Sequence, residues 1–392
     1  MQLIKKLLTL PKPIYFSIPI LISLFFFFHN LPINAVEITG IDFIGQATLP
    51  NNLTFQKTLV GGLSGITYDA KKDLYYAISD DRGQKAPARF YTLKIDLSKG
   101  KLTNGGVVTV GVTTLLNEKG QKFPPGQTDT EGIALSDKNT VFISSEGDVK
   151  QLVNPFVKEF SLSNGKEVTT LPIPQKFFPE KNNQQGIRDN LAFESLTITP
   201  NQNKLFTATE NALIQDGSEG KANTSTSCRI LQYNLFTKQL EKEYLYQTEA
   251  VTPLLDISKH FASGLPDLLA IDNLGNFLSI ERSFTGLGFY IALFQVSLEQ
   301  ASDIHNIDSL LQVDSKSIKP VEKKLLLDLR KLDVLLDNIE GLTLGSTLPD
   351  GQPSLILVSD NNFNSLQRTQ ILAFRLRMES RLMRLLRRLA PR

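Results

Sequence analysis

The same short pattern occurs five times along the chain, and this repetition constrains the fold more than any other feature. Each copy has a polar residue, a short apolar run, a polar turn, and a second apolar run that ends on a carboxylate. The copies occupy residues 62–83, 129–148, 192–211, 266–283 and 339–362. The opening polar residues, 63 to 73 positions apart, are Ser64, Glu131, Glu194, Asp267 and Glu340. The closing carboxylates are Asp80, Glu146, Glu210, Glu281 and Asp360.

Two apolar runs joined by a turn rich in Asp, Asn and Gly predict a β-hairpin. Further strand-like segments follow three of the hairpins, at 89–97, 156–162 and 229–235. Hairpins at long and even spacing are typical of a radial fold in which each repeat forms a four-stranded blade. We therefore predict an all-β β-propeller with six blades, five visible as repeats and a sixth within 212–262 or 285–335, which are long for loops. A β-sandwich whose strands are similar by chance is the alternative.

The two ends of the chain differ from the body between them. Residues 1–35 combine three lysines with an apolar run at 14–28 and a small residue, Ala35, at the expected cut, which is typical of an export signal. An uncleaved anchor is the alternative, although the run is short for a membrane span of about 20 residues. Either way, we expect the body, 36–376, in the periplasm or outside the cell. Residues 377–392 have six arginines and leucines at helical spacing, so they predict a basic amphipathic helix that either contacts an anionic membrane or is a frayed appendage.

Composition excludes several functional classes. The body carries 33 basic and 39 acidic residues, which argues against a nucleic-acid partner. The single cysteine, Cys228, excludes an intrachain disulfide and a cysteine-based zinc cluster. The chain has no G-x-S-x-G elbow, phosphate-binding loop, dinucleotide fingerprint or H-E-x-x-H motif. Hydrolysis would therefore need a metal-activated water with a carboxylate as base.

The repeated carboxylates suggest a metal site. In a propeller the innermost strands line a central channel, so carboxylates at the strand ends converge and repel one another unless a cation is bound. Oxygen ligands alone favour calcium, and then magnesium or manganese. The ligand candidates are Glu131, Glu194 and Glu340, with Asp80, Glu146, Glu210, Glu281 and Asp360 as a second ring. Alternatively, single acids among these cap turns or pair with a nearby arginine.

Three arginines accompany these acids. Arg82 and Arg188 lie in loops that contain Gly and Asn, where each would bind either substrate oxygens or an adjacent acid. Arg282 directly follows Glu281, and we expect an ion pair between them. The candidate catalytic residues are therefore Glu194, Arg188 and Arg82.

Several stretches of the body also carry a family resemblance. They read GLSGITYD…YYAISDDRG with PARFYTLKIDL, DTEGIAL…VFISSEGD, RDNLAFESLTITPNQNKLFTATEN, and NIEGLTLG…DGQPSLILVSDNNF with QRTQILAFRL. Together, from about Leu59 to Leu376, they resemble the phytase-like domain family, described as having esterase-like activity of phytase. The resemblance implies an exported bacterial β-propeller related to calcium-dependent phytases, which cleave phosphate monoesters from inositol phosphates. It extends to Glu131, Glu194 and Glu340 as acids of the family motif.

Three functions remain open from the sequence. The first is a calcium-dependent hydrolase that acts on a small-molecule phosphate or carboxylic ester. The second is a lactonase-like hydrolase, because the Glu-Gly step is also similar to that of calcium-dependent lactonase propellers, where such a glutamate binds the metal. The third is a binding module without catalytic activity, since a propeller fold does not by itself fix a function. The sequence does not indicate an oligomeric state.

Overall fold

The computed structural model describes residues 35–253, 261–286, 288–380, 382 and 384. It consists of a unit spanning Val36–Glu379 and a second unit made of Met1–Ala35 with Ser380–Arg392. The predicted export signal lies outside the described residues except for Ala35, and so does most of the predicted basic tail helix. The first four residues of that tail, 377–380, belong to a β-strand instead. No helix in the described ranges is long and apolar enough to cross a membrane.

Within the described residues, the unit Val36–Glu379 forms five four-stranded sheets, which we name blades A to E. Blade A consists of β4 (Leu63–Asp69), β5 (Leu74–Ser79), β6 (Arg89–Ile95) and β7 (Val107–Thr114). Blade B consists of β8 (Thr130–Ser136), β9 (Thr140–Ser145), β10 (Phe156–Ser161) and β11 (Glu167–Thr170). Blade C consists of β12 (Phe193–Ile198), β13 (Lys204–Thr209), β14 (Ser227–Asn234) and β15 (Gln239–Gln247). Blade D consists of β16 (Ala262–Ala270), β17 (Asn276–Phe284), β18 (Phe289–Ser297) and β19 (Glu322–Asp328).

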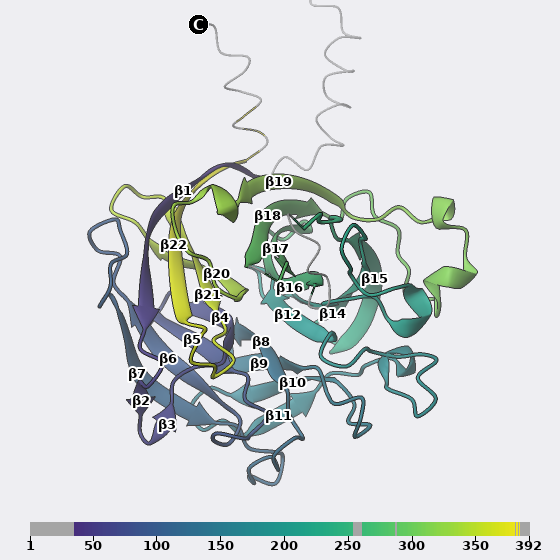
Figure 1. The fold of residues 1–392 in the computed structure, drawn as a ribbon, viewed down its shortest axis with the longest axis horizontal. Helices are drawn as coiled ribbons and strands as arrows, with labels where there is room; N and C mark the ends of the chain where they lie inside the picture. The colour runs from purple at the N-terminus through teal and green to yellow at the C-terminus, as the bar shows by residue number, and fades with distance from the viewer. Residues whose placement is uncertain (1–34, 254–260, 287, 381, 383, 385–392) are drawn as a thin grey trace, which may run out of the picture. The chain divides into compact units, whose positions relative to one another are not determined.

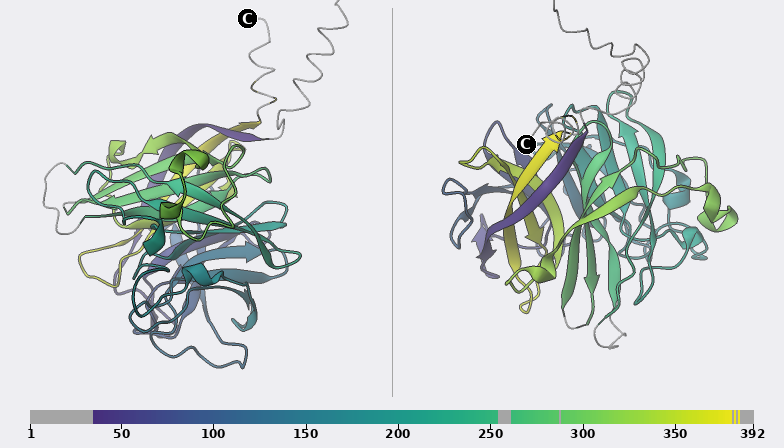
Figure 2. Two further views of the ribbon diagram at one scale, coloured as in Figure 1. Left: turned by 90° about the vertical axis from the view of Figure 1, so that its right-hand side faces the viewer. Right: turned by 90° about the horizontal axis from the view of Figure 1, so that it is seen from above.

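Blade E is closed by strands from both ends of the unit. It contains β20 (Ile339–Thr347), β21 (Pro353–Ser359) and β22 (Thr369–Ser380), and its outermost strand is β1 (Val36–Leu49). Figure 2 shows the purple β1 running beside the yellow β22. A strand from the start of the unit therefore completes the last blade, which leaves no blade with only three strands in the described part.

The five blades surround one axis. The innermost strands β4, β8, β12, β16 and β20 contact one another in this order, and β20 contacts β4 again. Their labels encircle the middle of the propeller in Figure 1. This ring confirms the predicted β-propeller and excludes the β-sandwich.

The prediction of six blades is wrong, because the described residues form five. The two stretches expected to hide a sixth blade contain the outer strands β14 and β15 of blade C and β18 and β19 of blade D. The remaining described parts of these stretches are loops and single turns of 3-10 helix. Their length thus reflects long outer strands and long connections rather than another repeat.

Short elements decorate the blades. A two-stranded hairpin is formed by β2 (Thr54–Phe55) and β3 (Thr58–Leu59). The described 3-10 helices are η1 (Gln175–Phe177), η2 (Ile214–Asp216), η4 (Leu310–Gln312), η5 (Ser315–Ser317) and η6 (Leu329–Lys331).

The hydrophobic core is divided among the five interfaces between neighbouring blades. In β13, Leu205 packs into the cluster between blades B and C, while Phe206 packs into the cluster between blades C and D. In β5, Tyr75 and Tyr76 likewise enter the clusters on opposite faces of blade A. Consecutive strand residues point to opposite faces, so a blade that is covered on both faces requires a continuous apolar run. This explains why apolar residues occupy consecutive positions in the second run of each repeat.

Candidate metal centre

A β-bulge lies near the start of every innermost strand. In β12, Phe193 pairs with Thr209 and Ser195 pairs with Ala208, so Glu194 between them has no partner in the ladder. The same irregularity occurs in β4, β8, β16 and β20. A bulge re-aims the side chain of the extra residue. In three blades the residue at this position is a glutamate: Glu131, Glu194 and Glu340.

The residue after each glutamate must be small, because neighbouring inner strands approach closely there. A Cβ atom on Gly132 would lie 2.7 Å from the carbonyl oxygen of Glu194, in the next blade. One on Gly341 would lie 2.8 Å from the carbonyl oxygen of Ser64. The Glu-Gly steps thus follow from the packing around the axis.

A second set of charged residues stands beside the first. The second strand of four blades is followed immediately by a carboxylate, and these residues are Asp80, Glu146, Glu210 and Asp360. In all four blades the backbone N–H of this residue donates to the carbonyl of the residue two positions before the bulged serine or glutamate, as Glu146 does to Asp129 at 2.9 Å. Asp129 is itself a carboxylate. It was not among the predicted ligands because the corresponding residues of the other three blades, Gly62, Ala192 and Asn338, carry no charge.

The structure brings these acids together. Among the described residues, the carboxylates at the bulges and directly after the second strands interact electrostatically with one another and with Asp129. These eight are Asp80, Asp129, Glu131, Glu146, Glu194, Glu210, Glu340 and Asp360. We call this group the carboxylate ring. It contains seven of the eight predicted ligand candidates, all except Glu281, together with Asp129.

Blade D departs from this pattern, and our alignment of it was shifted by one residue. Its bulge spans Leu265 and Pro266, so Pro266 occupies the glutamate position and Asp267 the position of the small residue. The Asp267 carboxylate accepts hydrogen bonds from the backbone N–H groups of Leu268 and Leu342, both at 2.8 Å. It therefore joins inner strands of blades D and E.

The same shift places Arg282, not Glu281, at the second charged position. Glu281 lies outside the carboxylate ring and accepts hydrogen bonds from Tyr246 Oη at 2.8 Å and Lys323 Nζ at 2.6 Å. The predicted ion pair between Arg282 and Glu281 is therefore wrong. Arg282 instead pairs with Glu210 at 2.7 Å and with Glu340.

The tightest group of acids lies on the blade A and B side. Single carboxylate oxygens of Asp80, Asp129 and Glu131 all lie within 4.8 Å of one another. Arg82 approaches this group through Asp129, with Nε to Oδ1 at 2.8 Å and Nη2 to Oδ2 at 2.6 Å. Arg82 also donates to Asn190 and keeps 34% of its side chain exposed. Of the two roles left open for Arg82, the structure shows contact with an acid, and its role toward a substrate stays a prediction.

Several ring oxygens lack partners despite their burial. Within the described part of the chain, Asp80 Oδ1 and Glu146 Oε2 are buried without a hydrogen bond. The other oxygen of Glu146 accepts the backbone N–H of Ala192. A buried acceptor without a donor costs about 1–3 kcal/mol, and more when it is charged. These oxygens therefore require a ligand or a proton.

Burial raises the pKa of most ring carboxyl groups. For Glu131, burial is the main cause, and the charges of Asp80 and Glu194 add to it. For Glu194, burial is again first, followed by Glu146 and Glu210. The pKa values of Asp80, Glu146 and Asp360 are raised in the same way. Each of these rises disfavours the ionised carboxylate, and a bound cation would oppose it.

The donor chemistry fits an oxygen-seeking divalent cation. The ring offers carboxylate oxygens from four blades, while the amide of Asn338 lies beside Glu340 with Nδ2 to Oε1 at 2.7 Å. No histidine or cysteine belongs to it among the described residues, and the cations that pair with it there are Arg82 and Arg282. Two guanidinium groups cannot balance eight carboxylates, so Ca²⁺, Mg²⁺ or Mn²⁺ would suit this donor set.

Arg188, a predicted catalytic residue, does not reach the ring through any contact in the described part of the chain. Its Nε donates to the carbonyl of Ala212 at 3.0 Å, and its Nη2 donates to the carbonyl of Gly217 at 2.6 Å. The side chain thus ties two loop segments together. We expect a structural role for Arg188.

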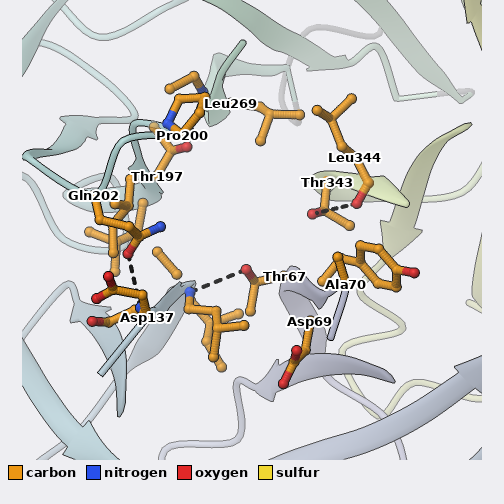
Figure 3. A pocket seen from close by; sticks show the side chains of 18 of the residues that line it. Thr67, Asp69, Ala70, Asp137, Thr197, Pro200, Gln202, Leu269, Thr343 and Leu344 are labelled. Atoms are coloured by element: carbon orange, nitrogen blue, oxygen red, sulfur yellow. Dashed lines mark hydrogen bonds between the residues drawn. The ribbon is translucent and has the colours of Figure 1, made fainter. Parts of the chain in front are cut away.

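A pocket of about 830 Å³ lies at the other end of the inner strands. Figure 3 shows Thr67, Thr197 and Thr343 around it. The hydroxyls of Thr67 and Thr197 accept backbone N–H groups at 3.2 and 3.0 Å, and Thr343 donates to the carbonyl of Leu344 at 3.0 Å. These three hydroxyls are thus satisfied by backbone groups.

Comparison with known proteins identifies one family. The Phytase-like family, described as "Esterase-like activity of phytase", matches residues 58–363. No curated protein matches the chain.

Solved structures match only at low identity. The periplasmic gluconolactonase PpgL of Pseudomonas aeruginosa is 12% identical, with 82% of this chain and 89% of that chain covered and a TM-score of 0.34. The catalytic domain of a Coprinopsis cinerea GH62 α-L-arabinofuranosidase is 8% identical, with 85% and 97% covered and a TM-score of 0.42. The tail fiber of Staphylococcus aureus phage P68 is 12% identical, with 91% of this chain but 56% of that chain covered and a TM-score of 0.39. These likenesses assign neither a substrate nor an activity.

Proposed function

Because the chain belongs to the Phytase-like family, described as having esterase-like activity of phytase, we propose that it is a metal-dependent hydrolase of small-molecule phosphate or carboxylic esters. The observation that carries this proposal is the carboxylate ring, in which eight acids meet two arginines and buried oxygens of Asp80 and Glu146 have no partner. Such an arrangement favours the uptake of a cation over a purely structural role for the acids.

Calcium is the metal that we propose. It accepts six to eight oxygen ligands in flexible geometry, whereas magnesium requires a near-ideal octahedron. Asp80, Asp129 and Glu131 would hold it, since their oxygens already lie close together. A bound divalent cation supplies Lewis-acid polarisation of a phosphoryl or carbonyl oxygen and makes water more acidic.

Glu194 is the proposed proton acceptor. Its carboxylate takes part in no hydrogen bond or ion pair within the described ranges, and its pKa is raised by burial and by Glu146 and Glu210. A carboxylate with a raised pKa is a better general base near neutral pH than an ordinary one. Arg82, partly exposed beside Asp129, would orient an anionic substrate group.

Hydrolysis assays with p-nitrophenyl phosphate, p-nitrophenyl acetate and a simple lactone test this function. We expect calcium-dependent turnover of at least one ester, which a chelator abolishes. E194Q should remove turnover while calcium binding persists, whereas E131Q should weaken both. E281Q, a buried glutamate outside the ring, is the control for both measurements.

Two results would redirect the proposal. Calcium binding without turnover of any of these substrates would favour a binding module, and turnover of the lactone alone would favour a lactonase-like hydrolase. The absence of both calcium binding and turnover would refute the proposal.

We also propose that the protein is exported to the periplasm or the cell exterior. The support is the lysine-rich start and apolar run of residues 1–35. Mass spectrometry of the mature protein should find a new N-terminus close to Ala35, whereas an intact N-terminus in a membrane fraction would indicate an anchor.

A further inference from the structure

Blade D places a cation where the other blades place an acid. Asp80, Glu146, Glu210 and Asp360 each follow directly after a second strand, and Arg282 takes the corresponding position on β17. Blade D therefore contributes a positive charge at a position where the other four blades contribute a negative one.

The guanidinium group of Arg282 is held by three neighbouring side chains. Its Nη2 donates to Glu210 at 2.7 Å, and its Nη1 donates to Asn338 Oδ1 at 2.7 Å and to Glu340. The side chain is 14% exposed. A single buried cation therefore binds carboxylates from blades C and E, which would otherwise repel each other across the axis.

Burial works against the charge of Arg282, yet Glu340, Glu210 and Glu194 together raise its pKa. The guanidinium is thus a permanent positive charge at this side of the ring. A divalent cation placed against the same carboxylates would meet both this charge and the volume of the side chain.

The opposite half of the ring is poor in cations. Arg82 pairs with Asp129 there, but it is partly exposed and shared with Asn190. Asp80 Oδ1 is buried without a partner, and so is Oε2 of Glu146, whose whole residue is 1% exposed. These unpartnered oxygens mark the half that requires a ligand.

We propose that Arg282 is a tethered counter-ion that takes the place of a second divalent cation, so that the ring binds such a cation only on the side of Asp80, Asp129 and Glu131. The inference rests on the proposed function, because it assumes that a cation binds in this ring. Arg282 is then a positioning residue that limits the number of bound ions.

Calorimetric titration of calcium into the chelator-stripped full chain tests this. R282Q removes the charge and should add about one calcium site per chain relative to the unaltered protein, because Glu194, Glu210 and Glu340 then lack a cation. R282K keeps a positive charge and should retain the original stoichiometry. K323Q is the matched control, since Lys323 is also a buried cation of blade D but pairs with Glu281 outside the ring.

The proposal is overturned if R282Q binds no more calcium than the unaltered protein, or if R282K and K323Q gain a site as R282Q does. If R282Q folds only when calcium is present, as measured by circular dichroism, the proposal is supported, because the ion replaces the lost charge. If R282Q stays unfolded with and without calcium while R282K folds, it is overturned. E131Q separately tests the calcium site formed by Asp80, Asp129 and Glu131. If E131Q binds calcium as tightly as the unaltered protein, the result counts against the proposed function but not against the role of Arg282.

Discussion

At the scale of single residues, charge balance decides what the axis of this propeller can bind. The acids of the ring are held by bulges and strand ends, so they cannot turn away from one another as surface acids do. Arg282 relieves the repulsion on one side, between Glu210 and Glu340. On the other side, Asp129 is the acid that connects Arg82 to the tightest group.

D129N should therefore weaken calcium binding. The substitution keeps the shape of the side chain but removes one negative oxygen from the group. We expect the affinity for calcium to fall by at least about tenfold, because the loss of a residue that only supports the ligands of a metal site already costs about that much. Calorimetric titration measures the change. D272N is the control, because Asp272 is a buried acid that accepts hydrogen bonds from Asn276 and Leu274 far from the ring. Equal affinity for D129N and the unaltered protein would show that Asp129 is no ligand.

At the scale of strands, the bulge near the start of each inner strand positions the site. The extra residue turns toward the axis, and the next residue must be small enough for the neighbouring strand to pass. In four blades the bulged serine or glutamate is followed by such a small residue, and these residues are Gly65, Gly132, Ser195 and Gly341. Function and packing are therefore linked within two consecutive residues.

G132A tests that packing directly. The new Cβ would lie 2.7 Å from the carbonyl oxygen of Glu194 and 2.7 Å from Cβ of Leu196, so the strands must separate. Overpacking of this kind costs about 1–3 kcal/mol in the free energy of unfolding. Chemical denaturation measures the loss, and G288A, whose Cβ would meet no atom within 4 Å, should change stability little. Equal stabilities of the two variants would contradict the close approach.

The strand scale also shows what could be read from the sequence and what could not. Hairpins are local, so the paired runs, their turns and the third strands at Arg89, Phe156 and Ser227 could be predicted from apolar runs and turn residues. The register of β16 could not, because Pro266 stands where three other blades have a glutamate, and the acid one residue later, Asp267, was therefore aligned with the glutamates. Comparing GLPDLLA with GLSGITY aligns Pro266 with Ser64 and would have corrected it.

At the scale of the whole molecule, the number of blades depends on contacts between distant parts of the chain. The visible repeats already equal the number of blades, but the loop lengths in the second half suggested one more. The closure of blade E by β1 was also invisible, since a strand at Val36–Leu49 pairs with one at Thr369–Ser380 without any local signal.

Removal of β1 should open the propeller. A chain that begins at Pro50 lacks the outer strand of blade E and its buried residues Ile38, Ala47 and Leu49. We expect it to lose its cooperative thermal transition, whereas a chain that begins at Val36 should keep it. Differential scanning calorimetry makes the comparison, and a cooperative transition at an unchanged temperature in the shorter chain would contradict this closure.

Stability should depend on pH in a way set by the ring. Raised pKa values mean that the folded, calcium-depleted protein holds more protons than the unfolded chain above the ordinary carboxyl range of about 4. The free energy of unfolding must then fall as pH rises through the window between the ordinary and the raised pKa values. We expect a lower melting temperature at pH 8 than at pH 5 in a chelator, and a larger rise on adding calcium at pH 8. A larger calcium-induced rise in melting temperature at pH 5 than at pH 8 would contradict the raised pKa values of the ring.

The most direct test of the central claim is a crystal structure of the protein grown in calcium. We predict electron density for an ion bound by oxygens of Asp80, Asp129 and Glu131, with Arg282 still bridging Glu210 and Glu340. A ring that contains only water and shared protons at millimolar calcium would contradict the account.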